Sequence, residues 1–296
     1  MEKIKRTFGF MFSHPLSRKH PLRSVMRFIA WQFQCTLSPH RFFIKAFIKP
    51  LKFYSRKGLA GATGNIYCGL HEFSEMSFLL HFLRPEDAFF DIGANIGAFS
   101  LLASGLCGSK IIALEPAPPA FNILEKNIKL NRLAGKLTAV NAAAGGSKGI
   151  LSFISDEDTT NHVIASDEKH RNSMEVPVIT VDSLLTEALP ALIKIDVEGF
   201  ETEVLKGMDK TLNARSLKAI IIELNGSGGR YGYDEEDIHQ LILSKGFAPY
   251  DYEPFARQLK CRAGKGNFNT IYCRDMAFIT ERLEAALKIH VMGEQI

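Results

Sequence analysis

The sequence predicts a doubly wound α/β domain with an antiparallel C-terminal hairpin, and two observations point to it. From Asp87 onward, apolar runs of strand length alternate with helical patterns, an order typical of a parallel sheet with helices on both faces. The first run ends in a bend of small residues, 93–97, and the second ends in the acidic residue Glu115. Because open α/β sheets bind ligands beyond the carboxyl ends of their strands, we expect the functional site at this edge.

The individual elements follow from the pattern of apolar residues. Strands buried on both faces lose the alternation of inside and outside residues, so the parallel strands are expected at 88–92, 110–114, 137–141, 192–196 and 219–224. A spacing of three to four apolar residues predicts a helix over 119–131. Toward the C-terminus we expect a helix over 235–245, antiparallel edge strands within 247–260 and 270–273, and a final helix over 276–290.

Residues 1–57 form a basic aromatic N-terminal extension, and residues 58–296 form the main domain. The extension holds thirteen Lys or Arg residues against one acidic residue, a formal charge of +12. We expect a helix over 21–35 and a hairpin that cover one end of the domain, with solvated lysines. The alternative is peripheral contact with an anionic membrane or polymer. No reader motif accompanies the charge, so a nucleic-acid partner is not expected.

Composition favours a cytoplasmic protein. No segment reaches the roughly 18 to 20 uninterrupted apolar residues of a membrane-spanning helix, and the apolar run at 8–12 is too short for a signal peptide. The five cysteines lie far apart without a CxxC pair, which favours a reducing compartment. Cys261 and Cys273 are expected to be free, half-buried thiols, or else to face each other across the C-terminal hairpin.

The bend after the first strand predicts a nucleoside ligand. Glycine there lets the backbone turn sharply and approach a ligand, and Glu115 can accept hydrogen bonds from ribose hydroxyls. The dinucleotide pattern G-x-G-x-x-G is incomplete, because Asn95 replaces its second glycine and Ala98 its third. That second glycine admits a pyrophosphate, and Asp91 would repel an anion. S-adenosylmethionine, a phosphate-free adenosine with a cationic sulfur, fits better than NAD(P), the cofactor of the rival oxidoreductase reading. A tight turn without a ligand is the remaining alternative.

Several ordered motifs also match a known family. They are Gly64-Asn65-Ile66-Tyr67, Gly69-Leu70-His71-Glu72-Phe73, the loop from Asp91 to Gly97, Glu115-Pro116, Asp158-Thr159-Thr160-Asn161-His162-Val163, Lys194-Ile195-Asp196-Val197-Glu198-Gly199-Phe200-Glu201 and Asn269-Thr270-Ile271-Tyr272. On these motifs the chain resembles the FkbM family of methyltransferases. The resemblance implies a Rossmann-like class I methyltransferase fold, S-adenosylmethionine as donor, and O-methylation of a hydroxyl on a sugar, glycan or other natural product.

The resemblance also assigns donor-binding residues. Glu115 would hold the ribose, Asn141 and Ala142 would border the adenine, and Asp196 would lie beside the sulfonium. The residues assigned to the rest of the donor site are Asp91, Gly93, Ala94, Asn95, Gly97, Pro116 and Glu72. Glu72 has an alternative role, because it precedes an apolar helix that it could cap.

Four residues are candidates for chemistry on the acceptor. Asp196 and Glu198 follow the fourth strand, and either could act as a base or, with Glu223, hold a divalent cation. We favour Asp196 as base or substrate-orienting carboxylate, while Glu198 could instead stabilise a helix N-terminus. His71 and His162 could also take the hydroxyl proton.

Three further charged residues are expected to have structural roles. The sequence does not identify the acceptor or other partners. Lys194 is expected to pair with an acid, and Glu201 and Glu203 are expected to be solvated. Sugar, glycolipid and polyketide acceptors all fit. A non-catalytic module that docks on membrane or polysaccharide-assembly machinery is the third hypothesis. The sequence predicts neither metal dependence nor oligomeric state.

Overall fold

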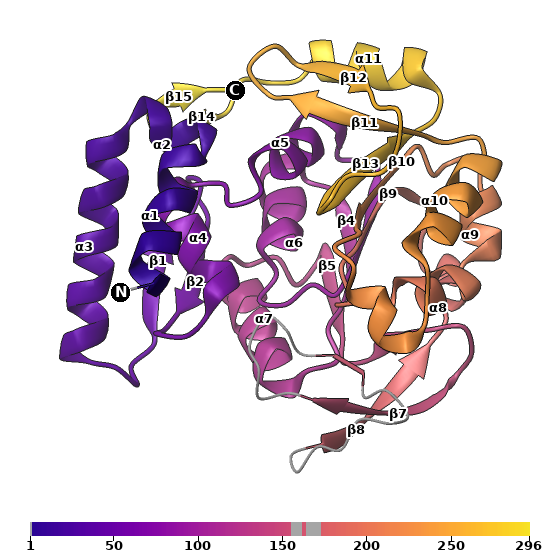
Figure 1. Cartoon of the computed structure of the whole chain (residues 1–296), viewed down its shortest axis with the longest axis horizontal. Coiled ribbons are helices and arrows are strands. Elements are labelled where there is room, and N and C mark those ends of the chain that lie inside the picture. The colour runs from indigo at the N-terminus through magenta and orange to yellow at the C-terminus, as the bar shows by residue number, and fades with distance from the viewer. Residues whose placement is uncertain (1, 155–161, 164–172) are drawn as a thin grey trace.

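The computed structural model describes residues 2–154, 162–163 and 173–296, and its centre is an eight-stranded mixed sheet (Figure 1). The strand order is β12-β11-β13-β10-β9-β3-β4-β5. The parallel strands are β3 (Ala88–Ile92), β4 (Lys110–Leu114), β5 (Leu137–Val140), β9 (Pro190–Ile195) and β10 (Ala219–Glu223). All five lie where the apolar runs predict them.

The C-terminal strands extend the sheet in antiparallel fashion, as predicted. They are β11 (Ala248–Glu253), β12 (Gln258–Cys261) and β13 (Asn269–Cys273). β11 lies between β12 and β13, so Cys261 and Cys273 do not face each other. Both thiols are free, as expected, but Cys261 is exposed and Cys273 is buried, so neither is half-buried.

Helices cover both faces of the sheet, which confirms the doubly wound fold. Consecutive residues of β3 point to opposite faces, and Phe89 and Phe90 accordingly belong to two different hydrophobic clusters. The first cluster is covered by α5 (Phe73–Phe82), α6 (Ala98–Leu102), α7 (Pro118–Leu130) and α11 (Met276–Glu284). The second is covered by α8 (Glu201–Lys206), α9 (Asp209–Asn213) and α10 (Glu235–Ser244). Short π or 3-10 segments occur at Ala103–Cys107, Val181–Thr186 and Ser227–Tyr231.

The N-terminal segment packs beside the first cluster and forms the predicted helix and hairpin. Its elements are α1 (Glu2–Ser13), α2 (Pro15–Lys19), α3 (Pro21–Leu37), β1 (Phe43–Ala46), β2 (Lys52–Ser55) and the following α4 (Ala60–Cys68). Met11, Leu16 and Trp31 are buried in the cluster that also contains Phe89. The sequence did not predict α1. The division of the chain between residues 57 and 58 stays a prediction.

The last helix is shorter than predicted. α11 ends at Glu284, and the chain then forms the hairpin of β14 (His290–Val291) and β15 (Glu294–Gln295), which Figure 1 shows beside α2. The Arg257 guanidinium donates to the carbonyls of Glu284, Ala286 and Leu287. A distant arginine thus satisfies carbonyls at the end of the helix, which a sequence pattern does not reveal.

A small second sheet was not predicted. β6 (Ala143–Ala144), β8 (Ser173–Ile179) and β7 (Gly149–Ile154) lie side by side, in that order, beyond the end of β5. The polar loop expected over 155–161 lies outside the described residues. Within the described part of the chain, no helix combines the length and the apolar character needed to cross a bilayer.

Candidate active site

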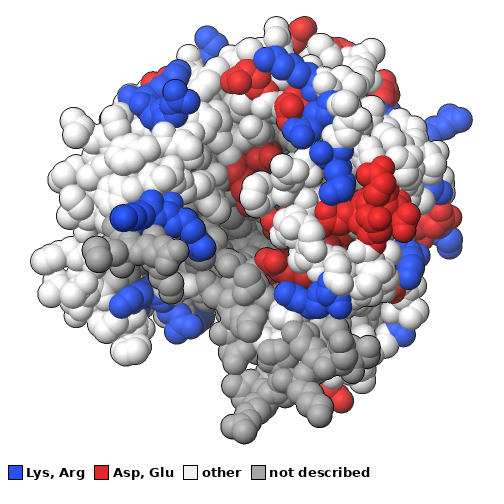
Figure 2. Space-filling model, in the orientation of Figure 1, with Lys and Arg blue, Asp and Glu red and all other residues white. Residues whose placement is uncertain are grey.

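A cavity of about 780 Å³ opens at the carboxyl ends of β3, β4, β9 and β10. β3 lies between β4 and β9, so the chain leaves β3 toward one side of the sheet and later returns to the other. At such a switch point the connections diverge and leave a crevice, as expected from the strand order. Figure 2 shows a hollow in this face of the molecule with acidic side chains at its margin.

The bend after β3 depends on glycine at two positions. Gly93 has a φ of +83°, and a Cβ there would lie 1.8 Å from the backbone oxygen of Asp196. Gly97 has a φ of +88°, and its Cβ would lie 2.4 Å from Leu124 Cδ1. Asn95 adopts the left-handed region without glycine, at a φ of +52°. Gly93, Ala94 and Asn95 line the cavity, whereas Gly97 does not line it and is the N-cap residue of α6.

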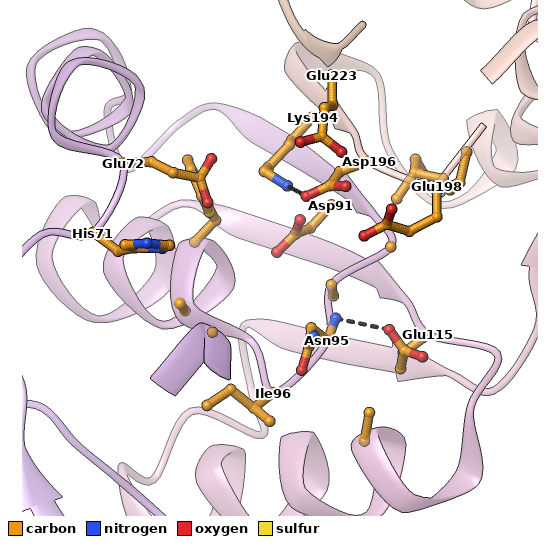
Figure 3. A pocket seen from close by; sticks show the side chains of 18 of the residues that line it. His71, Glu72, Asp91, Asn95, Ile96, Glu115, Lys194, Asp196, Glu198 and Glu223 are labelled. Atoms are coloured by element: carbon orange, nitrogen blue, oxygen red, sulfur yellow. Dashed lines mark hydrogen bonds and ion pairs between the residues drawn. The ribbon is translucent and has the colours of Figure 1, made fainter. Parts of the chain in front are cut away.

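Glu115 ties the bend to the neighbouring strand. Its Oε2 accepts from the Asn95 N–H at 2.8 Å (Figure 3). Its Oε1 accepts from the Ala117 N–H at 2.9 Å. Burial raises the pKa of Glu115 to about 7, against the lowering effect of those two bonds. Each carboxylate oxygen has a second lone pair, so Glu115 can still accept hydrogen bonds from a ligand.

Asp91 is buried at the end of β3. Its Oδ2 accepts from the Ser100 hydroxyl at 2.6 Å and from the Ser100 N–H at 3.1 Å. Burial raises the pKa of Asp91, and the Lys194 ammonium opposes that rise. Ser100 therefore fixes the orientation of the Asp91 carboxylate through one of its two oxygens.

Pro116 and Ala142 also line the cavity, whereas Asn141 does not. The Asn141 Nδ2 donates instead to the carbonyls of Glu115 and Pro116, at 2.8 and 3.0 Å. Asn141 therefore fixes the segment that follows β4. It can affect a bound ligand only indirectly, by positioning Glu115 and Pro116.

Three carboxylates gather beyond β9 and β10. One oxygen from each of Asp196, Glu198 and Glu223 lies within 4.8 Å of the others, and all three side chains are half-buried. Burial raises the pKa of Glu223, and the neighbouring carboxylates of Asp196 and Glu198 raise it further. Because its pKa is raised to about 9, Glu223 keeps its proton at neutral pH, which removes part of the repulsion within the cluster.

Lys194 supplies the positive charge of this cluster. Its Nζ lies 2.6 Å from Asp196 Oδ2, which confirms the predicted pairing with an acid. Burial alone would lower the pKa of Lys194, but Asp196, Glu72 and Asp91 together raise it above its ordinary value. Lys194 is thus a fixed cation.

The turn after β9 corrects one expectation. Glu201 is buried rather than solvated, and its Oε1 accepts from the N–H groups of Val197 and Gly199 at 3.1 and 3.2 Å. Glu201 is the first residue of α8, so it stabilises the helix N-terminus. Glu198 precedes the helix at a φ of +56° and lines the cavity, where burial raises its pKa to about 7. Glu203 is half-buried and pairs with Lys206 at 2.6 Å.

His71 and Glu72 line the opposite wall of the cavity (Figure 3). Glu72 makes no side-chain cap on α5; its Oε2 accepts from Asn269 Nδ2 at 2.6 Å. Burial raises the pKa of Glu72 and lowers the pKa of His71, so the His71 imidazole is neutral at working pH. His71 packs against Gly64, where a Cβ would lie 2.3 Å from its ring.

His162 is buried and does not line the cavity, whereas Val163 next to it does. The structure therefore does not bring His162 together with the other candidates. Residues 158–161 of the same motif lie outside the described part of the chain.

The N-terminal helix contributes a wall that sequence reasoning missed. Arg6, Thr7 and Phe10 of α1 line the cavity, and the Phe10 ring lies edge-on to His71 with centroids 5.0 Å apart. The only available signal was the amphipathic pattern of residues 2–13, which does not say what the helix packs against.

The sheet order and the bend held by Glu115 define a Rossmann-like α/β protein with its site at the switch point. Within that class, the chain belongs to the FkbM family of methyltransferases. The model of the methyltransferase FkbM domain matches residues 91–249, more than half of the chain. The match confirms the family resemblance that the motifs indicate.

Three relatives illustrate the family. The chain is 30% identical to the hexuronic acid methyltransferase AglP of Haloferax volcanii, over 55% of this chain and 64% of that protein. It is 30% identical to Methyltransferase 1 of Beauveria bassiana, over 55% of this chain and 74% of that protein. It is 28% identical to the 31-O-demethyl-FK506 methyltransferase FkbM of Streptomyces tacrolimicus, over 59% of this chain and 78% of that protein. The chain thus spans less than two thirds of the length of AglP.

Proposed function

We propose that this chain transfers a methyl group from S-adenosylmethionine to a hydroxyl group of a sugar, glycan or related natural product. The observation that carries the proposal is the charge of the cavity. Six carboxyl groups and two cations, Arg6 and Lys194, line it among the described residues, and Lys194 is already paired. Such a site attracts a cationic ligand and disfavours a pyrophosphate, which argues against a dinucleotide cofactor.

The residues around the bend fit the donor. The absence of a Cβ at Gly93 lets the bend pack against the backbone of Asp196. Glu115 offers lone pairs to a ribose diol, and Asp91 offers a counter-charge to an ammonium group. When bound, the donor supplies an electrophilic methyl group. Pro116 and Ala142 offer the apolar contacts that an adenine ring needs.

The acceptor would enter from the side of α1. Methyl transfer needs in-line approach, and positioning two reactants contributes roughly 7 to 11 kcal/mol of barrier reduction. We propose that Asp196, held by Lys194, receives the hydrogen bond of the acceptor hydroxyl and orients it. Neutral His71 makes no hydrogen bond through its ring to any described residue, so it is free to accept a proton as the second candidate base.

A divalent cation is the alternative counter-charge for Asp196, Glu198 and Glu223, because carboxylate oxygens suit Mg²⁺ and Mn²⁺. A proton held on Glu223 explains the same cluster without a metal, and we favour this explanation. We also propose peripheral contact between the basic N-terminal segment and an anionic membrane surface.

The names of two relatives, a hexuronic acid methyltransferase and a 31-O-demethyl-FK506 methyltransferase, support a sugar or natural-product acceptor. The test is mass spectrometry of glycans and small molecules from cells with and without the gene. A compound that is lighter by one CH₂ in the deletion, and that the purified chain methylates with labelled S-adenosylmethionine, is the expected result. An unchanged set of compounds, with no label transferred, would contradict the proposal.

A further inference from the structure

Helix α3 carries an apolar stripe that no part of the described chain covers. Leu22, Met26, Ile29, Phe33 and Leu37 are between 52 and 80% exposed. Their spacing of three to four residues puts them on one face of a helix about 25 Å long. Figure 1 shows α3 at the outer edge of the molecule, with α1, α2 and α4 on its inner side. Monomeric proteins rarely expose so continuous an apolar surface without a use for it.

A basic pocket of about 510 Å³ adjoins this stripe. Arg23, Arg27, Lys49 and His290 line it, and no acidic residue does. Arg23 and Arg27 each directly follow a stripe residue, so they lie about 100° further round the helix and border the apolar face on one side. Their guanidinium groups contact the carbonyl and the sulfur of Met292, and neither forms an ion pair with a described carboxylate. The pocket therefore offers unused donors and positive charge to an anion.

We propose that α3 docks the protein on an anionic phospholipid membrane, with the stripe in the interface and the basic pocket against lipid phosphates. The inference rests on the proposed contact of the N-terminal segment with an anionic surface. It assigns that contact to the exposed face of α3 and the basic pocket beside it. Apolar residues flanked by arginine are the combination that binds helices in the plane of such an interface.

Charge decides between a membrane and a second copy of the chain. The spacing of the stripe would also suit a helix pair, but two segments of formal charge +12 would then face each other. Anionic lipid provides the opposite charge, so the same residues attract it. Because α1 packs against α3 and also lines the cavity, a docked chain holds its cavity near the lipid surface.

The experiment is co-sedimentation of the full chain with vesicles of phosphatidylcholine alone or with added phosphatidylglycerol. We expect binding to the anionic vesicles that weakens as salt is raised. The triple variant Met26→Gln, Ile29→Gln, Phe33→Gln should lower binding at least about tenfold. The variants Arg23→Gln and Arg27→Gln should each lower it about fivefold. Leu189→Gln and Leu287→Gln, at exposed apolar positions elsewhere, are the matched controls and should bind like the wild type.

Each outcome is decisive. Circular dichroism verifies the fold of the triple variant, and the single variants Leu22→Gln and Phe33→Gln replace it if it misfolds. Wild-type binding that survives loss of the stripe overturns the assignment to α3 but not the membrane contact, while no binding to either vesicle overturns both. A wild-type dimer that the triple variant dissociates assigns the stripe to a second copy and also overturns the inference. Titration of S-adenosylmethionine in solution tests the proposed methyl transfer independently of all these results.

Discussion

The carboxylate of Glu115 accepts a hydrogen bond from the backbone N–H of Asn95, with 2.8 Å between Oε2 and nitrogen. Glu115, which follows β4, therefore fixes the conformation of the bend at 93–97 that follows β3. This single bond connects the two features of the sequence that predict a nucleoside ligand, and it holds them together at one edge of the sheet.

Replacing Glu115 should weaken donor binding. Glu115→Ala removes both the hydrogen bond to the bend and the lone pairs available to the ribose. We expect a loss of roughly 1 to 3 kcal/mol in binding free energy, measured by isothermal titration with S-adenosylmethionine. Glu253→Gln, at an exposed position on β11, is the control. An unaltered dissociation constant for Glu115→Ala would mean that the ribose lies elsewhere.

Gly93→Ala should disrupt the bend. The new Cβ would meet the backbone oxygen of Asp196, and the φ of +83° adds strain of roughly 1 to 3 kcal/mol. We expect a lower unfolding midpoint and no measurable donor binding. Gly135→Ala is the matched control, because nothing lies within 4 Å of its Cβ. Equal behaviour of the two variants would show that the close approach at Gly93 is not needed.

Asp196→Asn should separate chemistry from binding. The amide keeps the shape of the side chain but loses the charge that orients the acceptor hydroxyl. We expect turnover to fall about 100- to 10,000-fold while donor binding stays measurable. Asp237→Asn, exposed on α10, should retain full turnover. Full activity in Asp196→Asn would move the role to His71.

Donor affinity should rise with pH. Burial raises the pKa values of Glu115 and Glu198 to about 7, so both are largely protonated below that pH and ionised above it. A cationic donor favours the ionised forms, so its binding should release protons and tighten from about pH 6 to about pH 7.5, below the titration of an amino group. Calorimetry in two buffers of different ionisation enthalpy counts the protons. Binding without proton release would contradict this electrostatic account.

Glu223→Gln distinguishes a proton on Glu223 from a bound metal. An amide can donate to Asp196 as the protonated carboxyl does, so we expect activity within about tenfold of the wild type and no effect of a chelator. A metal ligand would instead be lost. Two results together would establish the cation site: the activity of Glu223→Gln falls more than about tenfold, and a chelator abolishes wild-type activity that added Mg²⁺ or Mn²⁺ restores.

The sequence predicted the parts of the molecule that local patterns encode. The five parallel strands, the bend at 93–97 and the pairing of Lys194 follow from apolar runs, glycine and a buried charge that needs a partner. Tertiary contacts account for the failures. Nothing near Glu201 indicates that its side chain turns back to accept hydrogen bonds from the turn that precedes its own helix. Nothing near Glu284 indicates that Arg257 donates to the carbonyls at the end of that helix.

The candidate site shows the same division. The position of Glu115 at a strand end is visible in the sequence, whereas the approach of α1 to His71 depends on packing between segments about 60 residues apart. Asn141 directly follows β5, close to the predicted end of the strand, yet its side chain bonds the neighbouring loop instead of lining the cavity.

The most direct test of the central claim is isothermal titration of the full chain with S-adenosylmethionine and, separately, with NAD. The account predicts saturable binding of S-adenosylmethionine that Glu115→Ala weakens, and no binding of NAD. Tight binding of NAD without binding of S-adenosylmethionine would contradict it.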